Sequence, residues 1–225
     1  ALRGDDFTGS NSYFNTAVGF SALRNIADDT YSNTAVGHSA LENNTTGFSN
    51  VGLGLNSLNM NTIGNENTAI GTGALEKNIE GSFNTAIGRS ASFYSTYASK
   101  NVVIGFEAMR QLDFANANTV FDGENVIIGY QAAYLLNPST TANGNRNVVI
   151  GSEAGYGSGA NHLFYENVMI GSDAGHDIST GRSNTFVGDV SGELITIGGY
   201  NAGLGHASLR RNLIGSWNAA LGTGA

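Results

Sequence analysis

The chain has 225 residues, with 10 Lys and Arg against 18 Asp and Glu, no Cys and a single Pro. The net charge of −8 and the scattered basic residues argue against a nucleic-acid-binding protein. The lack of cysteine excludes a disulfide framework and a thiolate metal site. Gly accounts for 32 residues without a three-residue period, so the chain is not collagen-like. No apolar run approaches the length of a membrane span, and we expect no membrane insertion.

A five-residue unit recurs along the chain: Asn, two small or apolar residues, an aliphatic residue and Gly. Successive copies lie 17 or 18 residues apart, except for three middle intervals of 24, 22 and 20 residues. The twelve copies begin at Asn15, Asn33, Asn50, Asn67, Asn84, Asn101, Asn125, Asn147, Asn167, Asn184, Asn201 and Asn218. A fixed period of this length predicts a solenoid in which each repeat forms one coil.

A coil of about 17 residues has no room for a helix pair, so we predict two or three short strands per coil. The expected fold is an all-β parallel β-solenoid over residues 15–225, after a lead-in segment at 1–14. Twelve coils rising about 4.8 Å each would make a rod about 58 Å long. The array fills almost the whole sequence, and we expect it to be a segment of a longer protein.

Each position of the unit suggests a role. The closing Gly is expected to need a positive φ or a tight corner, as at Gly88, whereas Gly157 in an insert is expected to tolerate a side chain. The repeated Asn predicts a stacked amide ladder between coils. The fourth position is always aliphatic, so we expect it to point into the coil together with the second position, which shares its face.

The third position is then expected to face away from the coil, yet it is never polar. No Asp, Glu, Lys or Arg occurs inside any of the twelve units. A strand that is apolar on both faces is typically buried on both, so we expect a second copy of the chain to cover this side. We predict a homotrimer, and the largest residues of the predicted interface are Val103, Ile127, Val149, Met169 and Phe186.

Lengthened coils between about residues 92 and 166 carry most of the features that distinguish one coil from another. Insertions in a solenoid map to loops on one face, which is often the binding face. Aromatic residues in surface loops suit recognition of a sugar or a protein, although they could instead cap the widened coils. The candidate ligand residues are Phe93, Tyr94, Tyr97, Phe114, Phe121, Tyr134, Phe164 and Tyr165.

A row of acidic residues is the other constellation of interest. Glu107, Glu153 and Asp173 all lie two residues after a unit Gly, with Gln131 at the same place between them. Stacked carboxylates repel one another unless they are solvated or bridged by a cation such as calcium. We favour a solvated edge and interpret His176 as an isolated surface histidine. We therefore expect no catalytic residues, no metal and no cofactor, and the chain is not expected to be an enzyme.

Three copies of the unit carry a resemblance to known proteins. Asn-Thr-Ala-Val-Gly-Phe-Ser-Ala-Leu at Asn15, Asn-Thr-Ala-Val-Gly-His-Ser-Ala-Leu at Asn33 and Asn-Thr-Ala-Ile-Gly-Thr-Gly-Ala-Leu at Asn67 resemble the repeats of phage tail fibres. They are also similar to the repeats in the heads of trimeric autotransporter adhesins, although those repeat near fourteen residues. The resemblance implies a left-handed parallel β-roll, a homotrimer and attachment to a cell surface.

The resulting expectation is a structural and receptor-binding segment of a trimeric viral tail fibre, with a host surface glycan or protein as its partner. It would be located in the virion or at a cell surface. A bacterial trimeric adhesin head or an extracellular filament is the first alternative. An ice-binding protein is a second, because Thr16, Thr34, Thr68 and Thr85 form a partial ladder; however, Val replaces Thr in the units from Asn101 to Asn167. A glycan-degrading enzyme is a third, but the scattered acids give it no focus.

Overall fold

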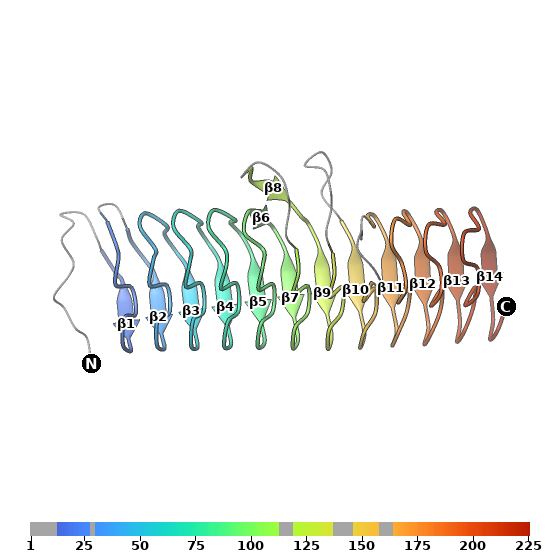
Figure 1. Cartoon of the computed structure of the whole chain (residues 1–225), viewed down its shortest axis with the longest axis horizontal. Coiled ribbons are helices and arrows are strands. Elements are labelled where there is room, and N and C mark those ends of the chain that lie inside the picture. The colour runs from blue at the N-terminus through green and yellow to red at the C-terminus, as the bar shows by residue number, and fades with distance from the viewer. Residues whose placement is uncertain (1–12, 28–29, 113–118, 137–145, 158–163) are drawn as a thin grey trace.

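The computed structural model describes residues 13–27, 30–112, 119–136, 146–157 and 164–225. Within these ranges all regular structure is β-strand. Twelve three-residue strands form one parallel sheet in chain order, one strand from each coil (Figure 1). The chain is therefore a β-solenoid, as the repeat period predicts.

The sheet is continuous from the first unit to the last, and each strand covers the second to fourth positions of its unit. Its strands are β1 (Thr16–Val18), β2 (Thr34–Val36), β3 (Val51–Leu53), β4 (Thr68–Ile70), β5 (Thr85–Ile87), β7 (Val102–Ile104), β9 (Val126–Ile128), β10 (Val148–Ile150), β11 (Val168–Ile170), β12 (Thr185–Val187), β13 (Ala202–Leu204) and β14 (Ala219–Leu221).

The expectation of two or three strands per coil is wrong for most coils. In the described part of the chain, the other strands are β6 (Ala98–Ser99) and β8 (Phe121–Asp122), which pair in parallel. The remainder of each coil consists mainly of turns and bends that still bond to the next coil. For example, the Asn43 N–H donates to the Asn59 carbonyl at 3.1 Å.

Strand register follows the unit without any slip. Thr68 pairs with Thr85 in the next coil, and Val102 pairs with Val126 across the longest interval. Extra residues are thus accommodated outside the sheet, and the predicted division into one repeat domain with lengthened middle coils is compatible with this register. Segments 113–118, 137–145 and 158–163 of those coils, and most of the lead-in, lie outside the described residues.

The third position of each unit points into the coil, not away from it. Ala69 and Ala86 are fully buried within the single chain, whereas Thr68 and Thr85 beside them are only half-buried. The predicted orientation of the strand was therefore wrong. The residues predicted to form an intermolecular interface lie in the coil's own core, at 0 or 1% exposure: Val103, Ile127, Val149, Met169 and Phe186.

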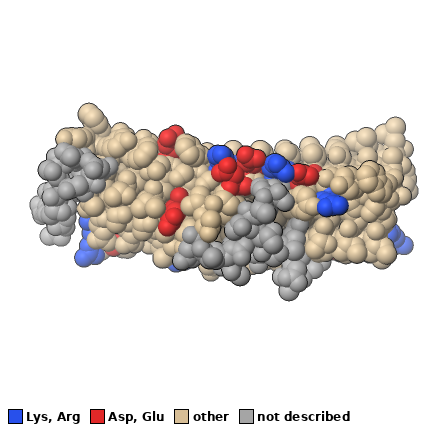
Figure 2. Space-filling view, turned by 90° about the horizontal axis from the view of Figure 1, so that it is seen from above, with Lys and Arg blue, Asp and Glu red and all other residues tan. Residues whose placement is uncertain are grey.

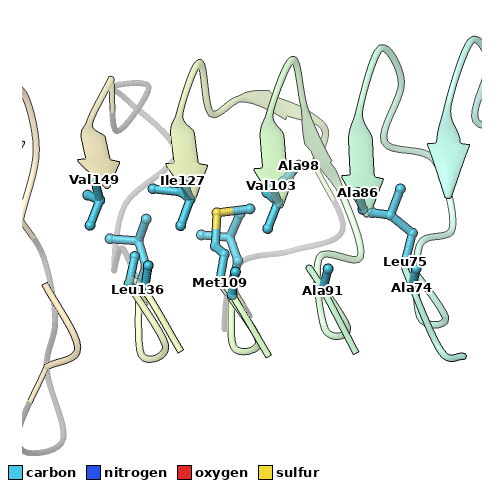
Figure 3. Close-up of a cluster of buried hydrophobic side chains, with 14 of the residues drawn as sticks. Ala74, Leu75, Ala86, Ala91, Ala98, Val103, Met109, Ile127, Leu136 and Val149 are labelled. Atoms are coloured by element: carbon cyan, nitrogen blue, oxygen red, sulfur yellow. The ribbon is translucent and has the colours of Figure 1, made fainter. Parts of the chain in front are cut away.

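Across the coil, the third position faces the eighth, ninth and twelfth positions, counted from the unit Asn (Figure 3). Figure 3 shows Val103, Ile127 and Val149 on the strands facing Met109 and Leu136 on the opposite turns. These side chains all belong to one continuous cluster of buried residues.

The sizes of the third and ninth positions compensate for each other. Where the third position is large, as at Met169 and Phe186, the ninth is Gly175 or Gly192. A Cβ on Gly192 would lie 2.7 Å from the Phe186 ring, and one on Gly175 would lie 2.4 Å from the Met169 sulfur. Close packing therefore couples the two positions in these coils.

The repeated Asn forms the ladder that the sequence predicts. Asn50 donates its backbone N–H and its side-chain Nδ2 to Asn33 Oδ1, at 2.9 and 3.1 Å. The same Nδ2 donates to the Gly64 carbonyl on the other side of its own coil at 2.8 Å. In most coils the buried Asn thus bonds the preceding coil and also ties its own coil together, whereas Asn101 donates to Ser99 and Asn84 of the preceding coil.

A second, shorter ladder at the twelfth position was not predicted. Asn61 donates to Asn44 Oδ1 at 2.7 Å, and Asn78 donates to Asn61 Oδ1 at 2.6 Å. The next rung is Ser95, whose hydroxyl bonds Ser92 instead. As a result, Asn78 Oδ1 is buried without a hydrogen-bond partner in the described structure.

Replacing Ser95 with Asn, together with Ala98→Gly, should extend this ladder by one rung. The second change is needed because a Cβ on Gly47, Gly64 or Gly81, which hold the place of Ala98 in the ladder coils, would lie 2.3–2.5 Å from the Asn Oδ1. The new amide would donate to Asn78 Oδ1, and Ser92 at the ninth position leaves more room than the Leu found there in the preceding coils. Because an unsatisfied buried acceptor costs about 1–3 kcal/mol, we expect a gain of about 1 kcal/mol in the free energy of unfolding by denaturant titration. Ser95→Ala combined with Ala98→Gly is the control from which this gain is measured, and an Asn variant less stable than the control would contradict the prediction.

The closing Gly has the predicted positive φ in every unit, from +124° at Gly222 to +145° at Gly151. A Cβ on Gly88 would also lie 2.4 Å from the Gly105 carbonyl oxygen of the next coil. Gly157 has a φ of +83°, so the expectation that it tolerates a side chain was wrong.

Two Gly→Ala substitutions test this account of the corners. Gly88→Ala should lower the free energy of unfolding by about 1–3 kcal/mol through backbone strain, and the steric clash should add to this loss. Gly52→Ala is the matched control, since Ala35 and Ala69 occupy the same third position in the adjacent coils. A Cβ on Gly52 would lie 3.1 Å from Ser57 Oγ, and this position has no positive φ, so we expect the control to lose less stability than Gly88→Ala. Equal losses in both variants would show that the corner does not require Gly.

Candidate functional surfaces

The outer face of the twelve-stranded sheet is the largest repeated surface of the molecule. It is formed by the second position, which is Thr, Val or Ala, and by the aliphatic fourth position. Both rows are only half-buried or exposed, and neither contains a charged or amide side chain. We call this surface the sheet face, and its fourth-position row is Val18, Val36, Leu53, Ile70, Ile87, Ile104, Ile128, Ile150, Ile170, Val187, Leu204 and Leu221.

Polar and aromatic side chains border the sheet face on both sides. Just before the strands, Arg146 pairs with Glu166 of the next coil. Just after them, Phe106 stacks on Tyr130 with ring centroids 5.5 Å apart, and the Arg89 guanidinium lies 5.7 Å from the Phe106 ring. An apolar centre with a polar and aromatic border is the usual anatomy of a protein–protein interface.

A row of stacked side chains runs along another side of the coils, at the tenth position. Arg110 lies 5.6 Å from the Phe93 ring and donates to the Tyr134 hydroxyl at 3.1 Å. Tyr134 stacks on Tyr156 and Tyr156 on His176, with centroids 5.2 Å apart in each pair. We call these five residues from successive coils the aromatic row. Partial burial, with the neighbouring Tyr134 and Glu153, raises the pKa of the Tyr156 hydroxyl, which favours the neutral phenol.

The predicted acidic row lies beside the aromatic row. Gln131 donates to Glu107 Oε2 at 2.8 Å, so an amide separates the first two carboxylates. Glu153 and Asp173 follow in adjacent coils, and their side chains reach His176. The interpretation of His176 as isolated was wrong, because the turn of the coil brings the seventh position of one coil close to the tenth position of the next.

Four of the eight aromatics predicted as ligand residues are unsuited to that role or lie outside the structure. Phe164 is fully buried and Phe121 is 9% exposed, so both belong to the core and are withdrawn as contacts. Tyr97 packs partly against the same core. These three fit the alternative in which aromatics cap widened coils. Phe114 lies outside the described residues.

The other four predicted aromatics are half-buried at the surface. Phe93 and Tyr94 form an edge-to-face pair with centroids 4.6 Å apart. Tyr134 lies two coils further along the aromatic row, where Arg110 bridges it to Phe93. Tyr165 is on a different side of the coil, where it accepts a hydrogen bond from Arg182 at 2.8 Å. The lengthened coils therefore bring three of the predicted residues together, but not the fourth.

A further exposed cluster near the end of the array was not predicted. The Arg182 guanidinium lies 5.5 Å from the Tyr200 ring, and Tyr200 stacks on Trp217 at 4.2 Å. With Tyr165 these residues line an open hollow of about 490 Å³. Their spacing of 17 or 18 residues in the sequence was the available signal.

Charged side chains are unevenly distributed over the molecule. Figure 2 shows that on one side Asp and Glu gather with Lys and Arg over the middle coils, whereas large parts of the described surface in that view carry no charge.

In the portion of the chain that the structure describes, no helix could cross a membrane. No protein-family model, curated protein or solved structure matches the chain. Function must therefore be inferred from these surfaces.

Proposed function

We propose that this chain is a shaft segment of a homotrimeric fibre that attaches to a cell surface, and that a viral tail fibre is its most plausible setting. The observation that carries the proposal is the sheet face, which is uncharged over all twelve strands. Its flat footprint is about 570 Å², taking twelve strands about 4.8 Å apart and three residues of about 3.3 Å each. This area leaves out the protrusion of the side chains, and it already lies at the upper end of the range of about 300–600 Å² for the largest apolar patch of a typical monomer.

Copies of the same chain are the partners best suited to this face. The rows of side chains recur with the rise of one coil over the whole array, and a partner with the same rise matches them along the whole length. Closed cyclic symmetry is the rule for homo-oligomers, and one apolar face per chain can be buried around a central axis. The interface residues in this proposal are the sheet face rather than the third-position residues of the core.

The choice of a trimer and of a viral fibre is supported by the resemblance of the Asn-Thr-Ala-Val-Gly and Asn-Thr-Ala-Ile-Gly units at Asn15, Asn33 and Asn67 to tail-fibre repeats. A bacterial adhesin head or an extracellular filament would use the same assembly and differ in its anchor. In either setting the regular coils provide reach and stiffness, because every coil hydrogen-bonds to its neighbour.

A matched pair of isoleucines tests the assembly. Ile70, on the sheet face, is 36% exposed, and Ile63, in the preceding coil but off the sheet, is 45% exposed. Sedimentation of the wild-type chain should give three times the 23.3 kDa chain mass. Ile70→Lys should shift the particle toward the monomer, since an unpaired charge in a buried interface costs several kcal/mol. Ile63→Lys should leave the mass unchanged.

A monodisperse wild-type monomer would contradict the proposal. So would an Ile70→Lys variant that keeps the wild-type mass while its folded β-spectrum is intact. A dimer would retain the sheet face as the interface but exclude three-fold symmetry.

An ice-binding role is favoured by one finding. The second-position residues Thr68 and Thr85 lie on the outer side of the sheet, not inside the coil as expected. The Thr row is nevertheless interrupted by Val at Val102, Val126 and Val148. Thermal hysteresis of the freezing point in the wild-type protein, lost in Thr68→Lys, would support this function over the fibre.

Receptor contact is assigned in this proposal to the aromatic row, because it is the part of the lengthened coils where half-buried rings and a guanidinium converge at the surface. Stacking of aromatic rings and Arg on a ligand suits sugars and protein side chains alike. Phe93→Ala combined with Tyr134→Ala should lower binding to host cells or a glycan array at least tenfold. Phe83→Ala, an exposed ring at another corner of the coil, is the control. Unchanged binding in the double variant would move the receptor site elsewhere.

A further inference from the structure

Three side chains of two adjacent coils converge at the border between the aromatic row and the acidic row. One ligand-type atom from each of Glu153, Asp173 and His176 lies within 4.8 Å of the other two. Glu153 comes from the coil that contains β10, and the other two residues come from the coil that contains β11. All three side chains are half-buried, so an ion in solution can reach them.

The imidazole of His176 is oriented by its surroundings. Its Nδ1 lies 2.8 Å from Asp177 Oδ1, and a carboxylate at this distance accepts the Nδ1–H hydrogen bond. The ring also stacks on Tyr156 at an interplanar angle of 9°. Nε2 is then left as the atom with a free lone pair. A carboxylate that holds one ring nitrogen so that the other can bind a metal is the common second-shell arrangement of metal-binding histidines.

The separation between Nε2 and the nearest carboxylate also suits two ligands of one ion. His176 Nε2 and Glu153 Oε2 are 3.7 Å apart, which is too far for a good hydrogen bond. Two ligands about 2.0–2.2 Å from a tetrahedral ion lie about 3.3–3.6 Å from each other. The pair therefore needs to move only by a few tenths of an ångström to share an ion.

The local charge also favours a cation. Three carboxylates, from Glu153, Asp173 and Asp177, surround one imidazole. Among the described residues, the ion pairs of Glu153 and Asp177 are both with His176. Stacked carboxylates in adjacent coils repel each other, and a bound divalent ion would convert this repulsion into a bridge between the coils.

We propose that Glu153, Asp173 and His176 bind one divalent transition-metal ion, with Asp177 as a positioning residue. An imidazole ligand with two carboxylates suits Zn²⁺ and its neighbours better than calcium, which takes oxygen ligands. Three protein ligands leave the fourth position to water, and the ion links the coil that contains β10 to the coil that contains β11. This site does not depend on trimer formation or on receptor binding.

Titration of the full chain with Zn²⁺ tests the site directly. We expect one ion per chain by calorimetry, and a higher melting temperature when Zn²⁺ is present than after chelation, because an ion that binds the folded state stabilises it. Co²⁺ should bind at the same stoichiometry and give visible d–d absorption bands that report the coordination geometry.

Variants separate this site from non-specific binding to an acidic surface. Glu153→Gln and His176→Gln should each weaken Zn²⁺ binding at least tenfold and remove the thermal shift. Asp177→Asn should weaken binding about 10–100-fold, the usual effect of losing a second-shell partner. Glu107→Gln is the matched control, because Glu107 lies in the same acidic row but its neighbours are Gln131 and Arg110.

The outcomes distinguish the alternatives. Wild-type protein without a stoichiometric Zn²⁺ site would overturn the proposal, as would Glu153→Gln binding as tightly as Glu107→Gln. Tighter binding of Ca²⁺ than of Zn²⁺, unaffected by His176→Gln, would also overturn it and assign the ion to the carboxylates alone. The substituted side chains are half-exposed and polar, and a retained β-spectrum in each variant shows that it is folded.

Discussion

The asparagine ladder is the interaction on which the rest of this structure depends. At the start of every strand of the twelve-stranded sheet after β1, the backbone N–H of the unit Asn bonds the side chain of the preceding unit Asn rather than a backbone carbonyl, as between Asn84 and Asn67. The amide is almost fully buried and is satisfied on both sides. A buried amide needs hydrogen-bond partners, and these partners lie inside the coil, so the Asn must face inward. Strand alternation then sends the third position inward as well and turns the second and fourth positions outward.

Two consequences follow from that orientation. The interior must be filled by the third position together with the opposite turn, and the pairing of large third positions with Gly175 and Gly192 shows how its volume is kept constant. The exterior of the sheet receives the remaining apolar residues, which form a face without charge along the whole array. In the proposed fibre this face forms the subunit interface, and the variable corners of the coils provide the specific contacts.

Much of the fold was predictable because the repeat is nearly exact in its first and last positions. The period, the parallel strands, the Asn ladder and the positive φ of the closing Gly all follow from it. Which face of the strand points into the coil did not follow from the repeat, because positions two to four are almost all apolar or Thr and show no polar alternation. The overlooked signal was the Asn itself, since the third position lies on its face by the two-residue period, and Ala69 follows Asn67 in this way.

The functional surfaces were less predictable, for a geometric reason. The turn of a coil brings Glu153 and Asp173 to His176, and no linear spacing of these three residues indicates this. Likewise, Phe164 is fully buried, although no pattern in its part of the sequence distinguishes it from the surface aromatics. By contrast, the aromatic row could have been found by aligning the coils, because Tyr134, Tyr156 and His176 each occupy the tenth position.

Hydrogen exchange of the asparagine side chains would test most directly whether the ladder faces inward. The side-chain amides of Asn67, Asn84 and Asn101 are buried and bonded to carbonyls of their own coils or to neighbouring Asn residues. Asn43 and Asn59 are only half-buried at another corner. The structure predicts that the first three exchange far more slowly than the last two by NMR. Equal rates in the two groups would mean that the ladder is open to water and that the strands are oriented the other way.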